Sequence, residues 1–160
     1  MTMTEPVADP AADPVVQRWV PPVSLALSVL GLAVSVYLTI EHYSSSTTLA
    51  CPDTGALNCL KVTTSEQSKL FGVPVALLGL LYFAAMLGLS LLWRSPRRDI
   101  RLGRLAFAGV GVLFVAWLVY AELFTLDAIC LWCTGVHVLA VGLFAVTALG
   151  TAYADPANLT

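Results

Sequence analysis

Four cysteines occur as two spaced pairs, and the second pair has the spacing of a reactive dithiol. Cys130 and Cys133, the helix pair, form a C-x-x-C sequence, and Asp127 before them is predicted to N-cap a helix. A helix N-terminus and the C-x-x-C spacing both lower thiol pKa values, which gives a nucleophile near neutral pH. A structural disulfide of this spacing would constrain little chain. The helix pair therefore indicates redox chemistry.

The first pair, Cys51 and Cys59, is separated by seven residues and is called the loop pair here. The intervening proline, glycine, aspartate and asparagine favour turns, so the pair can close a small disulfide or separate. Because disulfide exchange passes through mixed disulfides, such a pair can pass electrons from a soluble protein to a second pair. Zinc is the alternative use, but the spacing lies outside the usual two to four residues. No metal site is predicted.

The elements that must position these cysteines are membrane helices. The chain of 160 residues is 58% hydrophobic and only 11% charged. A bilayer core about 30 Å thick requires roughly 20 apolar residues per helix. Four stretches meet this requirement, and the sequence predicts an all-α integral membrane protein with a four-transmembrane-helix bundle. The expected spans are residues 23–40, 71–93, 105–126 and 128–149.

The basic residues predict the orientation, because Lys and Arg gather on the cytoplasmic side of a membrane. Arg18 precedes the first span, whereas Lys61 and Lys69 are the only lysines or arginines in the connections 41–70 and 126–127. Both termini are therefore expected in the cytoplasm, and all four cysteines at the outer face. The connection between the second and third spans holds five arginines: Arg94, Arg97, Arg98, Arg101 and Arg104.

The domain organisation follows from these spans. Residues 1–21 are rich in proline, alanine and acidic residues and lack a secretory signal, so a disordered cytoplasmic tail is expected. Residues 22–152 form the membrane catalytic domain, and residues 153–160 a short cytoplasmic tail. The amphipathic stretch 60–69 predicts a short interfacial helix that roofs the bundle. Because no nucleotide fingerprint or added soluble domain is visible, partners are expected to be separate molecules and not nucleic acid.

Several polar residues fall near the predicted outer end of the bundle. His137 follows Cys133 by four residues, which places it on the same helix face about 6 Å deeper. An ionisable group at that depth faces the bundle interior, where it bonds either a neighbouring carbonyl or a ligand. Ser65 and Ser68 lie over the outer mouth, where ordinary hydration is the alternative. Glu122 is explained by an interfacial position, although a role as a proton carrier stays open.

The order of these motifs resembles that of the vitamin K epoxide reductase family, over about residues 25–150. It differs from the other known type of quinone-coupled disulfide generator, in which the C-x-x-C pair comes first. The motifs are Cys51-x7-Cys59, Ser65 six residues later, Phe71-Gly72-Val73-Pro74, and Cys130-Leu-Trp-Cys133 with His137.

The resemblance implies a four-helix bundle around a quinone, either menaquinone or ubiquinone. Cys133 would face the quinone ring with Cys130 as its disulfide partner, and Cys59 and Cys51 would relay electrons from outside. Ser65 and His137 are the implied hydrogen-bond partners of the quinone carbonyls.

The implied activity is oxidation of a thioredoxin-like or DsbA-like partner, with transfer of its electrons to a membrane quinone. Many bacterial relatives carry a fused thioredoxin-like domain after the fourth helix, whereas this sequence ends about ten residues after the last expected span. The partner is therefore expected as a separate protein. The apolar composition indicates a bacterial plasma membrane. Two alternatives are a quinone or vitamin K epoxide reductase that serves a lipid cofactor, and a non-enzymatic membrane scaffold with structural disulfides.

Overall fold

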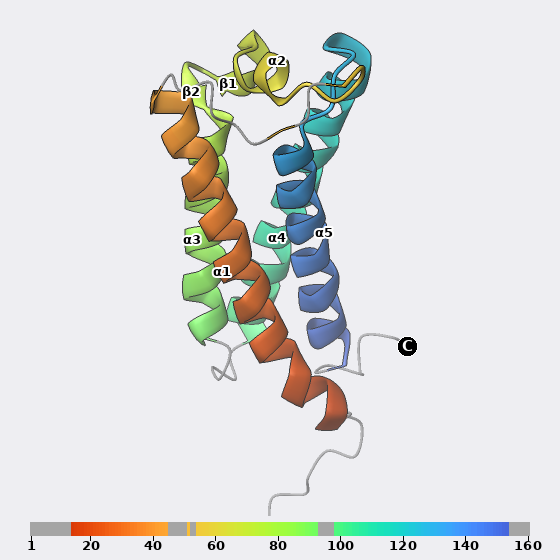
Figure 1. Cartoon of the computed structure of the whole chain (residues 1–160). Coiled ribbons are helices and arrows are strands. Elements are labelled where there is room, and N and C mark those ends of the chain that lie inside the picture. Colours follow the sequence, from red (N-terminus) through yellow and green to blue (C-terminus); the bar gives the residue numbers. More distant parts are fainter. Residues whose placement is uncertain (1–13, 45–50, 52–53, 93–97, 154–160) are drawn as a thin grey trace, which may run out of the picture.

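A computed structural model describes residues 14–44, 51, 54–92 and 98–153 of the chain. In this part of the chain, long helices run side by side as a bundle (Figure 1). They are α1 (Pro14–Ser44), α3 (Val75–Leu91), α4 (Arg98–Tyr120) and α5 (Leu131–Ala152). Short elements cover one end of the bundle, and α5 ends at the other.

The prediction of a helical membrane protein is confirmed by the length and apolar character of these helices. Residues 18–44, 99–125 and 131–152 are each long and apolar enough to cross a membrane. The helix α3 is apolar but shorter, with 17 residues. At 1.5 Å per residue it extends about 25 Å, close to the lower limit for a span.

Apolar side chains fill the interior of the bundle and also cover its outside. α1 packs against α3 and α5, and α4 packs against α5. The core contains Phe83, Met86 and Leu143, all fully buried. Phe83 occupies the space that a Cβ on Gly31 would need, so the glycine allows α1 and α3 to approach. Exposed leucines and valines on the outside are the surface expected of helices in lipid.

Two helices begin before the membrane spans expected from the sequence. α1 begins at Pro14, before the expected span 23–40, because proline suits the first turn of a helix, where an N–H has no partner. Residues 1–13 of the expected tail lie outside the described residues. α4 begins at Arg98, so Arg101 and Arg104 belong to the helix and not to the connection before it. Arg94 and Arg97 lie outside the described residues, as do residues 154–160 of the expected C-terminal tail.

The predicted helix over residues 60–69 is replaced by several shorter elements, which we call the cap (residues 54–74). The cap contains α2 (Cys59–Thr63), a 3-10 turn η1 (Glu66–Ser68) and a hairpin of β1 (Lys69–Leu70) and β2 (Val73–Pro74). Hydroxyl groups end α2, because Thr64 Oγ1 and Ser65 Oγ donate to the carbonyls of Leu60 and Val62, 2.7 Å away in each case. The hairpin also makes the fold not purely α-helical.

The connection between α4 and α5 is longer than expected and lies at the cap end of the bundle (Figure 1). α4 continues directly into a wider π-helical turn, η3 (Ala121–Thr125). There the N–H of Leu126 donates to the carbonyl of Ala121 at 2.9 Å. Asp127 follows with a positive φ of 47°. The predicted N-cap role of Asp127 is therefore wrong, and α5 begins at Leu131 with Cys130 as its N-cap.

Candidate active site

The helix pair sits at the N-terminus of α5. The sulfur of Cys130 accepts the backbone N–H of Cys133 at 3.3 Å, and both residues are free thiols. Cys130 is fully buried, whereas Cys133 is half-buried. A hydrogen bond from the Cys133 thiol lowers the pKa of Cys130 below its ordinary value of 9.0, while burial and the charge of Glu122 act in the opposite direction. The result is a pair in which Cys130 is the better thiolate.

The loop pair is joined as a disulfide between Cys51 and Cys59, whose Cα atoms lie 6.1 Å apart. Cys59 is the first residue of α2 and is 2% exposed, whereas Cys51 is half-buried. Asn58 caps α2, because its side-chain oxygen accepts the backbone N–H of Lys61 at 2.8 Å. The short helix thereby fixes Cys59 with Cys51 as its more accessible partner.

A backbone bridge joins the cap to the chain segment before α5. The N–H of Asn58 donates to the carbonyl of Ile129 at 3.1 Å, and the N–H of Ile129 donates to the carbonyl of Ala56 at 2.8 Å. This is a parallel pairing, with Leu57 opposite Ile129. The residues that follow, Cys59 and Cys130, are buried in one apolar cluster against which Cys51 and Cys133 also pack. The bridge therefore brings the two pairs together.

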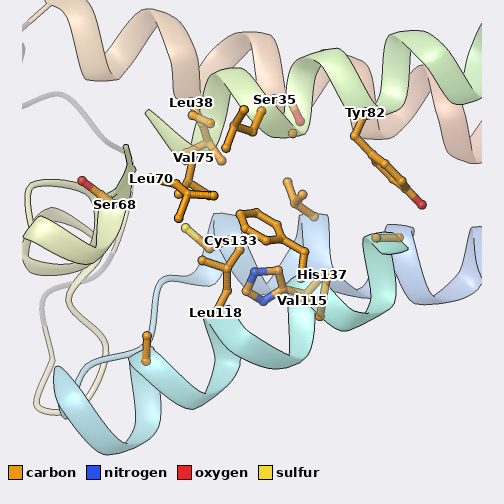
Figure 2. A pocket seen from close by; sticks show the side chains of 18 of the residues that line it. Ser35, Leu38, Ser68, Leu70, Val75, Tyr82, Val115, Leu118, Cys133 and His137 are labelled. Atoms are coloured by element: carbon orange, nitrogen blue, oxygen red, sulfur yellow. The ribbon is translucent and has the colours of Figure 1, made fainter. Parts of the chain in front are cut away.

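A cavity of about 440 Å³ opens inside the bundle next to the helix pair. All of the long helices and the cap contribute to its walls, which are mostly apolar. Of the four cysteines, Cys133 alone lines it. Figure 2 shows the Cys133 thiol and the His137 ring in the same space, beside Val115 and Leu118 of α4. His137 is 7% exposed and lies on the helix face that the sequence predicted.

The two serines at the cavity mouth are already engaged with the backbone. The Ser65 hydroxyl donates to the carbonyl of Val62 at 2.7 Å, and the Ser68 hydroxyl donates to the carbonyl of Ser65 at 2.6 Å. Both residues line the cavity, as expected. With both hydroxyl hydrogens engaged in this way, the two oxygens can serve a ligand only as acceptors. To donate to a ligand carbonyl, Ser65 must first release Val62.

The cavity fits a ligand with an apolar body and a few polar atoms. Its volume lies within the range of about 300–1,000 Å³ typical of small-molecule pockets. Two polar atoms deeper in the wall, Ser35 Oγ and the Tyr82 hydroxyl, are buried without a hydrogen-bond partner in the described part of the chain. Tyr82 lies at the opposite end of the cavity from Ser68 (Figure 2). Buried polar atoms normally have partners, so these two suit a polar ligand atom or water.

Glu122 was left out of the predicted site residues, although a role as a proton carrier stayed open. The interfacial explanation was wrong, because the residue is 6% exposed and lines the cavity. Its carboxylate accepts the backbone N–H of Cys130, and its carbonyl accepts the N–H of Ala128 at 3.1 Å. The available signal was that Glu122 is the one acidic residue within the predicted span 105–126. Ionisable residues inside membrane segments are functional candidates by default.

Comparison with known protein families agrees with the motif order in the sequence. The model of the vitamin K epoxide reductase family matches residues 22–148, which is most of the chain. The match includes both cysteine pairs, the cap and the cavity. The chain therefore belongs to the vitamin K epoxide reductase family, and this membership supports an oxidoreductase activity in a membrane.

Proposed function

We propose that the protein is a quinone-dependent thiol-disulfide oxidoreductase that oxidises a thioredoxin-like protein and supports disulfide formation in exported proteins. One observation carries this proposal. The cysteines form an ordered path in which Cys51 is the accessible member, Cys59 and Cys130 share one buried cluster, and Cys133 lines the apolar cavity. A scaffold with structural disulfides would need no such order.

In the first stage, a reduced partner attacks the loop disulfide. Cys51 is the target, because Cys59 is buried beneath the cap. A mixed disulfide forms between the partner and Cys51, and Cys59 leaves as a thiol. The second thiol of the partner then releases Cys51, so that two electrons and two protons have moved to the loop pair.

In the second stage, Cys59 attacks Cys130 of a closed helix pair, and Cys133 leaves as a thiol. Cys51 then attacks Cys59, which closes the loop disulfide again and leaves both members of the helix pair reduced. The structure holds this combination of a closed loop disulfide and two free thiols on α5. It corresponds to the stage before electrons leave for the quinone.

The second substrate is a membrane quinone, menaquinone or ubiquinone, which accepts two electrons and two protons and leaves as a quinol. Cys133 is the thiol that delivers the electrons, because it is the member of the helix pair inside the cavity. Ser65 and His137 orient the carbonyl oxygens by hydrogen bonds. The apolar walls hold the ring and exclude water, which strengthens these polar interactions.

The proposal places the cap outside a bacterial plasma membrane and both termini in the cytoplasm. α1, α3, α4 and α5 all cross the bilayer in this arrangement, with α3 as the shortest span. Arg18, Arg101 and Arg104 then lie at the cytoplasmic end, in agreement with the preference of basic residues for that side.

The test is anaerobic quinone reduction by the detergent-purified protein supplied with a reduced thioredoxin-like protein. Quinol formation is followed by absorbance, with each cysteine replaced singly by alanine. All four variants are expected to lose turnover, and a reduced partner that lacks its second thiol is expected to trap a mixed disulfide at Cys51 of the unsubstituted protein. Full activity without Cys130 or Cys133 would refute the proposal. Turnover of vitamin K epoxide without oxidation of the protein partner would favour a lipid-cofactor reductase instead.

A further inference from the structure

The proton path of the helix pair is not explained by the cysteines alone. Closing the disulfide between Cys130 and Cys133 releases two electrons and two protons, and the quinone takes up both. Cys133 opens into the cavity and can pass its proton directly. Cys130 is fully buried between the cap and α5 and does not line the cavity. Its proton needs a carrier.

We propose that Glu122 carries the proton of Cys130 into the cavity, where the reduced quinone takes it up. The inference rests on the function proposed above and assigns a residue to one of its steps. Glu122 lies between the two places that the proton must connect. Its carboxylate is bonded to the backbone N–H of Cys130, and its side chain lines the cavity that Cys133 enters.

The local backbone holds Glu122 in this position. The π-helix η3 changes the helical register at residues 121–125, and such distortions occur frequently at functional sites. The carbonyl of Glu122 also accepts the N–H of Ala128, which ties η3 to the segment that leads to Cys130. The charge of Glu122 acts on the thiols of both Cys130 and Cys133.

Other ionisable groups face the same cavity but are less well placed to serve Cys130. They are His42 on α1, Tyr82 on α3, and Cys133 and His137 on α5. Among the described residues, Glu122 and Cys133 are the ionisable groups that act electrostatically or by side-chain hydrogen bonding on Cys130. Cys133 is the other reactant, so Glu122 is left as the carrier.

The step balances in atoms and electrons. The Glu122 carboxylate takes the proton of the Cys130 thiol, and the Cys130 sulfur forms the bond to the Cys133 sulfur. The electron pair released from Cys133 reduces the quinone, which takes one proton from Cys133 and one from Glu122. Glu122 returns to the carboxylate, and the products are a disulfide and a quinol.

The experiment compares Glu122→Gln with the wild-type protein in single-turnover quinone reduction from the reduced helix pair, between pH 5 and pH 9. The glutamine oxygen still accepts the N–H of Cys130 but cannot carry a proton. Glu66→Gln is the matched control, because Glu66 is an exposed acidic residue of the cap outside the cavity. Time-resolved infrared spectra recorded during quinone reduction provide a second measurement, in which transient protonation of a carboxyl group is visible directly.

The expected result is a fall of about 100-fold in the rate of quinone reduction by Glu122→Gln, with an unchanged KM for the quinone. We expect the wild-type rate to fall at acid pH, because a carrier that is already protonated cannot take the proton of Cys130. Both this fall and the transient carboxyl band should be absent from the variant. Glu122→Asp should keep part of the rate, with a shifted pH profile. The Glu66→Gln control should match the wild type in every measurement.

Three results would overturn the inference. Wild-type rate, pH profile and infrared spectrum in Glu122→Gln would exclude proton transfer through this residue. An equal slowing of the earlier step, reduction of the loop disulfide by the partner, would mean that Glu122 only supports the local structure. A wild-type protein that forms no quinol from its reduced helix pair would refute the proposed function itself, and the inference with it.

Discussion

The two cysteine pairs use the same residue type in opposite environments. The loop pair belongs to the cap, a set of short elements, and is closed as a disulfide with one half-buried member. The helix pair is placed at the end of a 22-residue helix and consists of free thiols, one of them fully buried. The difference teaches that the two pairs divide two properties: the loop pair has the more accessible member outside the cavity, and the helix pair is protected beside it.

The forces that hold the two pairs also differ. The cap relies on side chains that bond to the backbone, such as Asn58 to Lys61 and Ser65 to Val62. α5 is held by the regular backbone hydrogen bonds of a helix and by packing of Leu143 and Ala140 in the core. Local opening costs less free energy where few buried contacts are lost. We therefore expect the cap to open more easily than α5, which holds Cys133 in the cavity.

The largest expected effect is a loss of turnover that depends on the electron donor, because a protein and a small dithiol should react with different cysteine pairs. Cys51→Ala should lose turnover with a protein donor but keep turnover with dithiothreitol, because a small dithiol can reach the half-buried Cys133. Cys133→Ala should lose quinone reduction with both donors. The measurement is quinol formation with each donor. Loss of both activities in Cys51→Ala would mean that the helix pair is closed to small thiols.

The backbone bridge between the pairs is the next target. Ile129→Pro removes the N–H that donates to the carbonyl of Ala56. Loss of about 1.4 kcal/mol should slow the transfer from Cys59 to Cys130 roughly tenfold. Rapid acid quenching and thiol labelling measure this step, and Ile129→Val, which keeps the N–H, is the control. An unchanged transfer rate in the proline variant would show that the bridge does not align the pairs.

A smaller effect is expected from the cap of α2. Asn58→Ala removes the oxygen that accepts the N–H of Lys61, which costs about 1 kcal/mol of local stability. Hydrogen exchange of the Lys61 amide should therefore become roughly fivefold faster. Asn58→Asp keeps an acceptor and should exchange like the wild type. Equal protection in all three proteins would contradict the capping role.

The smallest effect concerns the titration of Cys130. The thiol of Cys133 lowers the pKa of Cys130 by a hydrogen bond, so Cys133→Ser should keep much of this lowering and Cys133→Ala should lose it. In both variants Cys130 is the one free thiol while the loop disulfide stays closed, and thiolate absorbance near 240 nm reports it. Its midpoint should lie at lower pH in the serine variant, and identical midpoints would contradict the hydrogen bond.

The lowered pKa of Cys130 also predicts how the free energy of unfolding changes with pH. The folded protein favours the thiolate of Cys130, so this contribution to the free energy of unfolding is complete above the ordinary value of 9.0. It declines as the pH falls toward the pKa of the folded protein and is absent below it. The stability difference between Cys133→Ser and Cys133→Ala should therefore grow with pH.

The sequence by itself determined the features that depend on local pattern. Long apolar runs require helices in lipid, because only internal hydrogen bonds can satisfy the backbone there. The C-x-x-C spacing placed Cys130 and Cys133 one turn apart, and a four-residue step placed His137 on the face of Cys133. Motif order was enough to indicate the family that residues 22–148 match. Helix starts were less predictable, because proline is compatible with a first turn.

Only the tertiary structure decided how the two pairs meet and which polar groups surround them. The pairing of Leu57 with Ile129 joins segments more than 70 residues apart, and no local pattern encodes it. The short elements of the cap could not be predicted, because they depend on hydrogen bonds from hydroxyl groups to backbone carbonyls. In the unfolded chain the same hydroxyl groups bond to water. Glu122 was assigned to the interface because burial depends on neighbours from other elements. The fold, and not the residue type, places its carboxylate beside Cys130.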